Sequence, residues 1–227
     1  GALEGHGHGL AFIEAHLRNG VLPCAKHFPG HGDTTSDSHL TLPSLPHDFD
    51  RLEAVELLPF RAVVSSELPA IMTAHILFEK LDPVHPASLS RPVLQDLLVT
   101  QLGFQGLIIT DCLEMKAVSE RYTIEEMIEL GLSAGIDIFL ICHTESLWRR
   151  AWNHLVLLGQ ESEEDRKRIL SSALHIQQRK SQGLSQSSPP KDPLSVLGCR
   201  SHRALFADRD LDRHDDLDSD PTESVDK

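Results

Sequence analysis

The amino-acid sequence predicts an α/β fold in which parallel strands alternate with helices. Four short apolar runs are separated by segments whose apolar residues recur with helical spacing. They cover residues 22–27, 70–75, 107–111 and 136–142. The runs are apolar throughout, as is usual for parallel strands covered on both faces by helices. Polar side chains end or directly follow the runs, and in such folds the carboxyl ends of the strands form the active-site face. The pattern fits a (β/α)8 barrel or an open α/β sheet.

One helix is predicted before the first strand and another after it. Residues 10–17 have helical spacing and stop at Asn19-Gly20, a common helix end. Residues 51–64 are also helical in pattern, although Pro59 should bend this helix or split it in two. Before both, Gly and His alternate over residues 5–9. This tract is either flexible or a weak metal-binding segment, and its low complexity favours flexibility.

Capping signals mark the later helices. Ser90 precedes Arg91-Pro92, a typical N-cap with proline at the start of a helix. Thr123 precedes a segment with acidic residues in its first turn, and another acidic turn follows Ser162. We therefore expect helices over residues 91–102, 124–132, 145–159 and 162–180.

The end of the chain has a different composition. From about Gln182 it is rich in Ser, Pro, Asp and Arg and contains few apolar residues, so it cannot bury enough surface to fold. We expect a folded domain over residues 1–181 and a disordered acidic tail over residues 182–227.

Charge and hydropathy exclude several classes of partner. The formal net charge of the 227 residues is −13, which argues against nucleic acid because phosphate binding needs a Lys/Arg surface. No apolar run approaches the roughly 20 residues that span a bilayer, and the start lacks the pattern of a signal peptide. We expect no nucleic-acid and no membrane partner.

The cysteines are scattered singly, with no CxxC pair. They are Cys24, Cys112, Cys142 and Cys199. We expect reduced thiols, and we expect the first three to be buried as small apolar side chains because they lie in or just after apolar runs.

The loop after the first predicted strand concentrates titratable groups. Residues 26–39 contain one lysine, three histidines and two aspartates. Buried charges must be paired or they cost several kcal/mol, so such a segment suits a functional site better than a core. Within it, Asp37 can hydrogen-bond and orient His39, which could then transfer a proton near neutral pH. Taken alone, the pair also fits a solvated loop histidine.

Two alternative interpretations concern metal binding and helix capping. His27, His31, Asp37 and His39 are all acceptable zinc or iron ligands. Proline and glycine between His27 and His31 prevent the helical turn of a metalloprotease motif. Asp111 ends an apolar strand and could cap a helix, act as a reagent, or do both.

Several motifs in one order resemble the β-N-acetylglucosaminidases of glycoside hydrolase family 3. Residues 26–43 resemble the family loop that reads KHFPGHG, four variable residues, DSH and a nearby LP. Residues 71–75, IMTAH, resemble the next strand, and residues 109–117, ITDCLEMKA, resemble the strand and turn of the nucleophile. Residues 134–137, AGID, are similar to the opening of the last barrel strand.

The resemblance implies a retaining double displacement in a (β/α)8 barrel, without cofactor or metal. Asp111 would be the nucleophile, and His39, oriented by Asp37, the general acid/base. Lys26 and His27 would bind the sugar. A neutral imidazole beside an anionic nucleophile avoids like-charge repulsion, and it can donate a proton and later accept one.

The resemblance covers only part of a barrel. A closed barrel needs eight strands and typically about 250 residues, and the four predicted strands correspond to strands 5 to 8. The family's motif of the type D-x-E-G-G-R is not found in the sequence. We therefore expect a partial barrel and a piece of a longer protein or a degenerate product.

The implied activity is hydrolysis of terminal β-linked N-acetylglucosamine from a glycan or a peptidoglycan fragment, in the cytoplasm. An inactive remnant or a binding module is the alternative. Transfer of the sugar to phosphate is a third possibility, since a histidine acid/base does not repel an anion. The aglycone and the oligomeric state stay open.

Overall fold

The computed structural model describes residues 2–32, 34, 41–66, 68–184, 199 and 200. The chain divides into two compact units, residues 1–187 and 188–227, and the fold below belongs to the first. The predicted tail lies outside the described residues, apart from the end of the last long helix and residues 199 and 200.

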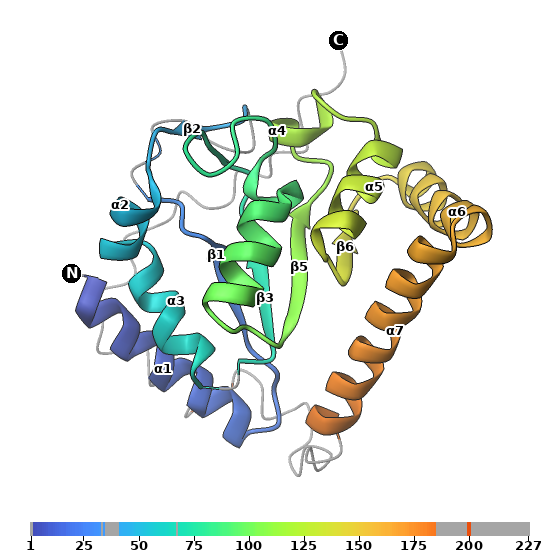
Figure 1. The fold of residues 1–227 in the computed structure, drawn as a ribbon. Helices are drawn as coiled ribbons and strands as arrows, with labels where there is room; N and C mark the ends of the chain where they lie inside the picture. The colour runs from blue at the N-terminus through green and yellow to red at the C-terminus, as the bar shows by residue number, and fades with distance from the viewer. Residues whose placement is uncertain (1, 33, 35–40, 67, 185–198, 201–227) are drawn as a thin grey trace. The chain divides into compact units, whose positions relative to one another are not determined.

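A four-stranded parallel sheet forms the centre of the first unit (Figure 1). Its order is β1 (Cys24–Phe28), β3 (Ala70–Thr73), β5 (Leu107–Cys112) and β6 (Ile138–Leu140). Strands that neighbour each other in the sheet also follow each other in the chain, as in successive βα units of a (β/α)8 barrel. The predicted α/β fold with four such units is confirmed, and β6 is shorter than expected.

Pairing places the ends of the strands at one edge. Ala70 is opposite Cys24 in β1 and opposite Leu107 in β5, so the three strands start level with one another. Because all four run in the same direction, their carboxyl ends gather polar side chains at the same edge of the sheet. A second, two-stranded parallel sheet, β2 (Ser44–Leu45) with β4 (Leu77–Phe78), was not predicted because two residues are too few to show a pattern.

Three helices lie on the side of the sheet next to β1 (Figure 1): α1 (Ala2–Arg18), α2 (Phe49–Ala54) and α3 (Leu57–Val64). The Gly-His tract at residues 5–9 belongs to α1, so the expected flexible segment is wrong. The predicted helix over residues 51–64 is two helices, and the break comes at Val55 and Glu56. Pro59 lies in the first turn of α3, where a missing N–H removes no helical hydrogen bond.

The remaining helices are short η1 (Ala87–Leu89), π-helical η2 (Pro92–Gln101), α4 (Lys116–Ser119), α5 (Ile124–Ala134), α6 (Glu145–Glu161) and α7 (Glu163–Leu184). The helix start predicted after Thr123 is confirmed and takes the form of a capping box, since the Thr123 hydroxyl accepts from the Glu126 amide and the Glu126 carboxylate accepts from the Thr123 amide. Gly135 ends this helix at φ 90°, a left-handed conformation that suits glycine.

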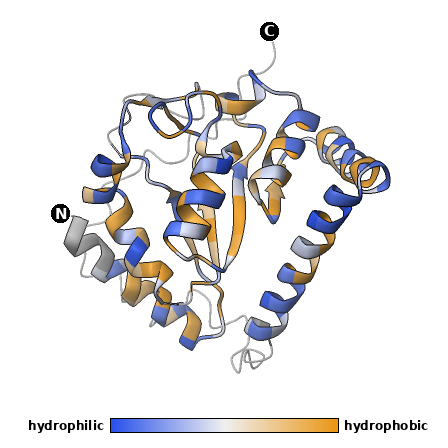
Figure 2. Ribbon diagram, in the orientation of Figure 1, coloured by the Kyte–Doolittle hydropathy of each residue, from blue (hydrophilic) through white to orange (hydrophobic). Residues whose placement is uncertain are grey.

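Apolar side chains fill the space between sheet and helices. Figure 2 shows hydrophobic residues concentrated on the strands, whereas α7 is largely hydrophilic. Phe28, Ile71 and Leu94 belong to the main cluster, and Leu113 and Ile128 belong to a second one beside α5. Among the described helices, none combines the length and apolar character that crossing a bilayer requires.

Candidate active site

Asp111 lies near the carboxyl end of β5, at an irregularity in the pairing with β6 between Ile109 and Cys112. Its Oδ1 atom accepts a hydrogen bond of 2.7 Å from the backbone N–H of Cys112. The side chain is 21% exposed. Asp111 does not cap a helix, because α4 starts only at Lys116 and its N-cap residue is Met115. The capping interpretation is therefore wrong, and the carboxylate faces the strand-end edge.

His27 reaches Asp111 from β1. The distance from His27 Nε2 to Asp111 Oδ2 is 3.4 Å, close enough for an ion pair when the imidazole is protonated. The His31 ring stacks edge-on against His27, with ring centroids 5.1 Å apart. Because β3 lies between β1 and β5 in the sheet, the two side chains meet across the end of β3. The sequence predicted both residues for the site, but not their direct contact.

Lys26 precedes His27 on β1 and is exposed. The Lys26–His27 and Phe28–Pro29 peptide bonds are both cis. Asp37 and His39 lie outside the described residues. The assignment of an acid/base pair therefore stays a prediction, as does the alternative metal set that includes these two residues.

Glu56 supports the loop that follows β1. It is 7% exposed, at the start of α3, and its Oε2 atom accepts a 2.5 Å hydrogen bond from Arg51. A Cβ atom added at Gly30, whose φ is 132°, would lie 2.9 Å from the Glu56 Cβ. Gly32 also has a positive φ, of 54°, beside Glu56 Oε1. The two glycines thus allow the loop to pass directly over a buried carboxylate, a role for Glu56 that local sequence does not reveal.

His75 lies under the site, almost fully buried. Its Nε2 atom is 3.0 Å from the carbonyl oxygen of Cys112, and its Nδ1 atom is 2.7 Å from the hydroxyl of Ser88. A carbonyl only accepts, so Nε2 carries the proton and the hydroxyl donates to Nδ1. Burial lowers the pKa of His75 and keeps the ring neutral. The neutral ring therefore holds the backbone directly after Asp111.

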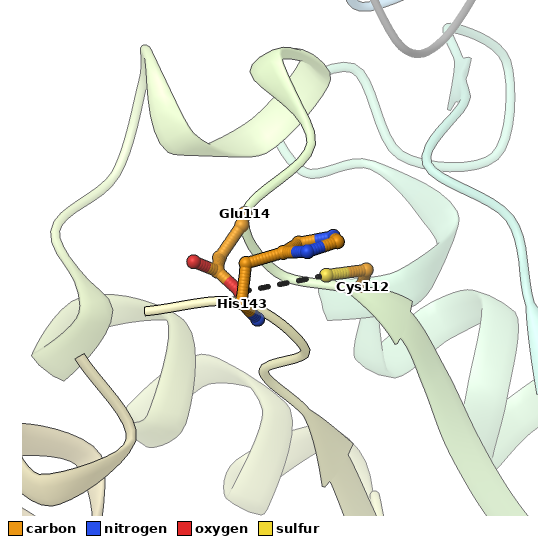
Figure 3. Close-up of side chains that lie close together, drawn as sticks. All are labelled: Cys112, Glu114 and His143. Carbon is orange, nitrogen blue, oxygen red and sulfur yellow. Dashed lines mark hydrogen bonds between the residues drawn. The ribbon is translucent and has the colours of Figure 1, made fainter. Parts of the chain in front are cut away.

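Glu114 joins the turn after β5 to the turn after β6. Its two carboxylate oxygens accept hydrogen bonds from the backbone N–H groups of His143, at 2.6 Å, and Thr144, at 2.9 Å. Burial alone would raise the pKa of Glu114, but these hydrogen bonds outweigh it and leave the pKa lowered. The Cys112 thiol lies beside this carboxylate, 3.9 Å from Oε2 (Figure 3). The carboxylate is thus a fixed anion at the rim of the site.

Cys24 and Cys142 are exposed and Cys112 is half-buried, and all three are free thiols. The prediction that they are buried in the core is wrong. Strand-end positions bring Cys112 and Cys142 to the polar edge of the sheet, because the apolar runs that precede them end there.

The arrangement suits nucleophilic chemistry on a polar ligand. A partly exposed carboxylate is held by a backbone amide on one oxygen and faces an imidazole with the other. Carboxylates in such a position can form covalent intermediates, and imidazole and ammonium groups can donate hydrogen bonds to hydroxyl groups.

Comparison with known proteins gives consistent matches. Residues 5–178 match the family model described as glycosyl hydrolase family 3 N terminal domain. Beta-hexosaminidase A of Pseudoalteromonas piscicida is 33% identical over 218 residues, which cover 88% of this chain and 36% of that protein. Beta-hexosaminidase of Neisseria gonorrhoeae (strain NCCP11945) is 37% identical over 138 residues, which cover 61% of this chain and 38% of that protein.

A solved structure of a glycoside hydrolase family 3 beta-N-acetylglucosaminidase from Paenibacillus sp. str. FPU-7 superposes on the chain with a TM-score of 0.71 at 36% identity. The superposition covers 80% of this chain and 35% of that one. The chain thus spans little more than a third of the length of these similar proteins.

Proposed function

Because the chain belongs to glycosyl hydrolase family 3, we propose that residues 1–181 are the C-terminal half of the catalytic barrel of a retaining β-N-acetylglucosaminidase. The observation that supports this most directly is the position of Asp111, at the carboxyl end of a barrel strand and 3.4 Å from His27. The names of the similar proteins, beta-hexosaminidase and beta-N-acetylglucosaminidase, support the substrate class.

In the proposed reaction, the Asp111 carboxylate attacks the anomeric carbon of a terminal β-linked N-acetylglucosamine. A glycosyl ester forms on Asp111 as the bond to the leaving oxygen breaks, and water then hydrolyses the ester. His39, oriented by Asp37, donates the proton to the leaving oxygen and later takes a proton from the water. The leaving group belongs to a glycan or a peptidoglycan fragment.

Lys26 and His27 are proposed to bind hydroxyl groups of the sugar. His27 has a second role in this proposal, because its contact with the Asp111 carboxylate orients the nucleophile before attack. One imidazole can serve both partners, since its two nitrogen atoms point in different directions.

A non-catalytic role is the second candidate, and a specific observation favours it. The edge strands of the described four-stranded sheet are β1 and β6, each paired on one side only. The side chains of β6 are all half-buried, as expected where a barrel is open. Within the described residues, groups for binding a sugar therefore come from four strand ends only.

Covalent labelling distinguishes the two candidates. The full chain is incubated with a fluorinated N-acetylglucosaminyl fluoride, which forms the glycosyl ester quickly and hydrolyses slowly, and the labelled peptide is identified by mass spectrometry. We expect a label on Asp111 that Asp111→Ala removes. Asp96→Asn, an exposed aspartate on η2, is the control and should keep the label.

Hydrolysis of nitrophenyl β-N-acetylglucosaminide, followed by the release of nitrophenol, is measured in parallel. A label that survives in Asp111→Ala rejects this residue as the nucleophile. A chain that melts cooperatively but shows neither label nor nitrophenol release supports the non-catalytic candidate.

A further inference from the structure

We propose that Cys112, Glu114 and His143 form a binding site for a divalent cation of the zinc type, at the rim of the sheet beside the proposed active site. One ligand atom from each residue lies within 4.8 Å of the others. Figure 3 shows the thiol, the carboxylate and the imidazole gathered in one place, from the end of β5 and from the turn after β6. This inference is independent of the proposed glycosidase activity.

The distances suit a zinc ion after a small movement. Zinc bonds of about 2.0 to 2.3 Å at tetrahedral angles place two ligand atoms about 3.5 Å apart. The sulfur of Cys112 and Oε2 of Glu114 are 3.9 Å apart already. His143 is exposed, so its ring can rotate toward the other two groups without disturbing the core.

The sulfur of Cys112 and the ring nitrogen of His143 determine which metals the site would prefer. Thiolate and imidazole prefer zinc, cobalt and related transition metals, whereas magnesium and calcium prefer sites made only of oxygen. Glu114 is already oriented, since two backbone N–H groups fix its carboxylate. Such outer hydrogen bonds are typical of metal-binding carboxylates because they hold the ligand in place.

Three protein ligands leave one position of a tetrahedral zinc ion open, and a water molecule can fill it. Coordination would release a proton from each thiol that binds.

Helix capping alone does not account for the cluster. The contacts of Glu114 with the N–H groups of His143 and Thr144 cap the start of α6. A cap needs neither a thiol nor an imidazole, yet both lie beside the same carboxylate. A bound ion would link β5, which carries Asp111, to the edge strand β6.

Cobalt binding tests the proposal on the full chain, kept reduced with a phosphine. We expect one Co²⁺ per chain and a thiolate-to-cobalt charge-transfer band in the near ultraviolet. Competition with a chromophoric chelator then gives the Zn²⁺ affinity. Cys112→Ser should remove the band and weaken Zn²⁺ binding at least tenfold, and His143→Ala should also weaken it at least tenfold. Magnesium in excess should not compete.

Three control variants separate this site from others. Cys24→Ser removes an exposed thiol at the start of β1, and His8→Ala removes a histidine of the Gly-His tract; both should bind Zn²⁺ as the natural chain does. Asp111→Ala should also keep the metal, so a failed glycosidase proposal does not affect this result. Far-ultraviolet circular dichroism confirms that each variant is folded.

Absence of the charge-transfer band in the natural chain would overturn the proposal. So would undiminished Zn²⁺ binding in a folded Cys112→Ser variant, or loss of binding in His8→Ala.

Discussion

The imidazole of His27 lies 3.4 Å from the carboxylate of Asp111, although the two residues belong to strands that are not neighbours in the sheet. The contact exists because both side chains lie at the carboxyl-end edge and reach over the end of β3. It connects the first strand of the described sheet with the strand that carries the proposed nucleophile.

Removal of this contact should slow formation of the covalent intermediate. In His27→Ala, Asp111 loses its imidazole partner and the sugar loses a hydrogen-bond donor. A hydrogen bond to a charged group is worth about 1.5 to 3 kcal/mol, so we expect covalent labelling to slow by about 10- to 100-fold. The measurement is the rate of labelling by the fluorinated sugar. His85→Ala, on the loop after β4, is the matched control. An unchanged rate in His27→Ala would show that the contact has no part in the reaction.

Gly30→Ala should destabilise the loop that follows β1. The new Cβ would lie 2.9 Å from the Glu56 Cβ, at a φ of 132° that L-residues rarely adopt. Backbone strain of this kind costs about 1 to 3 kcal/mol. Urea unfolding of the full chain measures the loss. Gly9→Ala is the control because nothing lies within 4 Å of its added Cβ, and within helix α1 it should keep or raise stability. Equal stability of the two variants would contradict the assigned role of Glu56.

Glu114→Gln should weaken the link between the turns after β5 and β6. The charged carboxylate accepts two backbone hydrogen bonds, and its replacement by an amide should cost about 1 to 2 kcal/mol at pH 7. Because the folded pKa is lowered, this stabilisation is present above the unfolded pKa of 4.5 and is lost as the pH falls through the folded pKa.

Urea midpoints from pH 7 to pH 3 test this dependence. The difference in urea midpoint between the natural chain and Glu114→Gln should disappear in acid. Glu120→Gln, an exposed glutamate at the end of α4, is the control and should show no such difference. If the two urea midpoints still differ at pH 3, the substitution acts through packing and not through the charge of Glu114.

Much of the fold could be predicted because its signals are local. An apolar run ends in a polar residue at Asp111, and a capping box begins α5 at Thr123; each is visible within a few residues. Parallel strands also gather their carboxyl ends, which is why Asp111 and His27 were placed at one site from the sequence. Asp37 and His39, which complete the proposed machinery, remain predictions because they lie outside the described residues.

Other parts of the site depend on contacts between distant segments. Glu114 meets the N–H of His143, 29 residues later, and His75 meets the Cys112 carbonyl, 37 residues later. No spacing rule connects such positions in a single sequence. The thiols of Cys112 and Cys142 were assigned to the core because apolar residues precede them. Cys112 is instead the last residue of β5 and Cys142 follows the end of β6, so Cys112 is half-buried and Cys142 is exposed at the rim.

His75 should make the stability of the chain depend on pH in a defined range. Burial lowers the folded pKa of His75 below the unfolded value of 6.5. Its contribution to stability is therefore complete above pH 6.5 and is lost as the pH falls from 6.5 toward the folded pKa, because only the unfolded state takes up the proton readily. Acid should thus destabilise the natural chain through this residue.

His75→Gln removes the titration and replaces the ring with an amide that cannot reproduce both hydrogen bonds, to Ser88 and to the Cys112 carbonyl. At pH 8 the variant should be less stable by about 1 to 3 kcal/mol. Between pH 6.5 and pH 5 the natural chain loses stability through His75 and the variant does not, so the difference between their urea unfolding free energies should narrow. His16→Gln, at a partly exposed histidine on α1, provides the control for a change of histidine as such. A difference that stays constant from pH 8 to pH 5 would mean that His75 titrates alike in the folded and unfolded chain, and that its ring is not held neutral beneath Asp111.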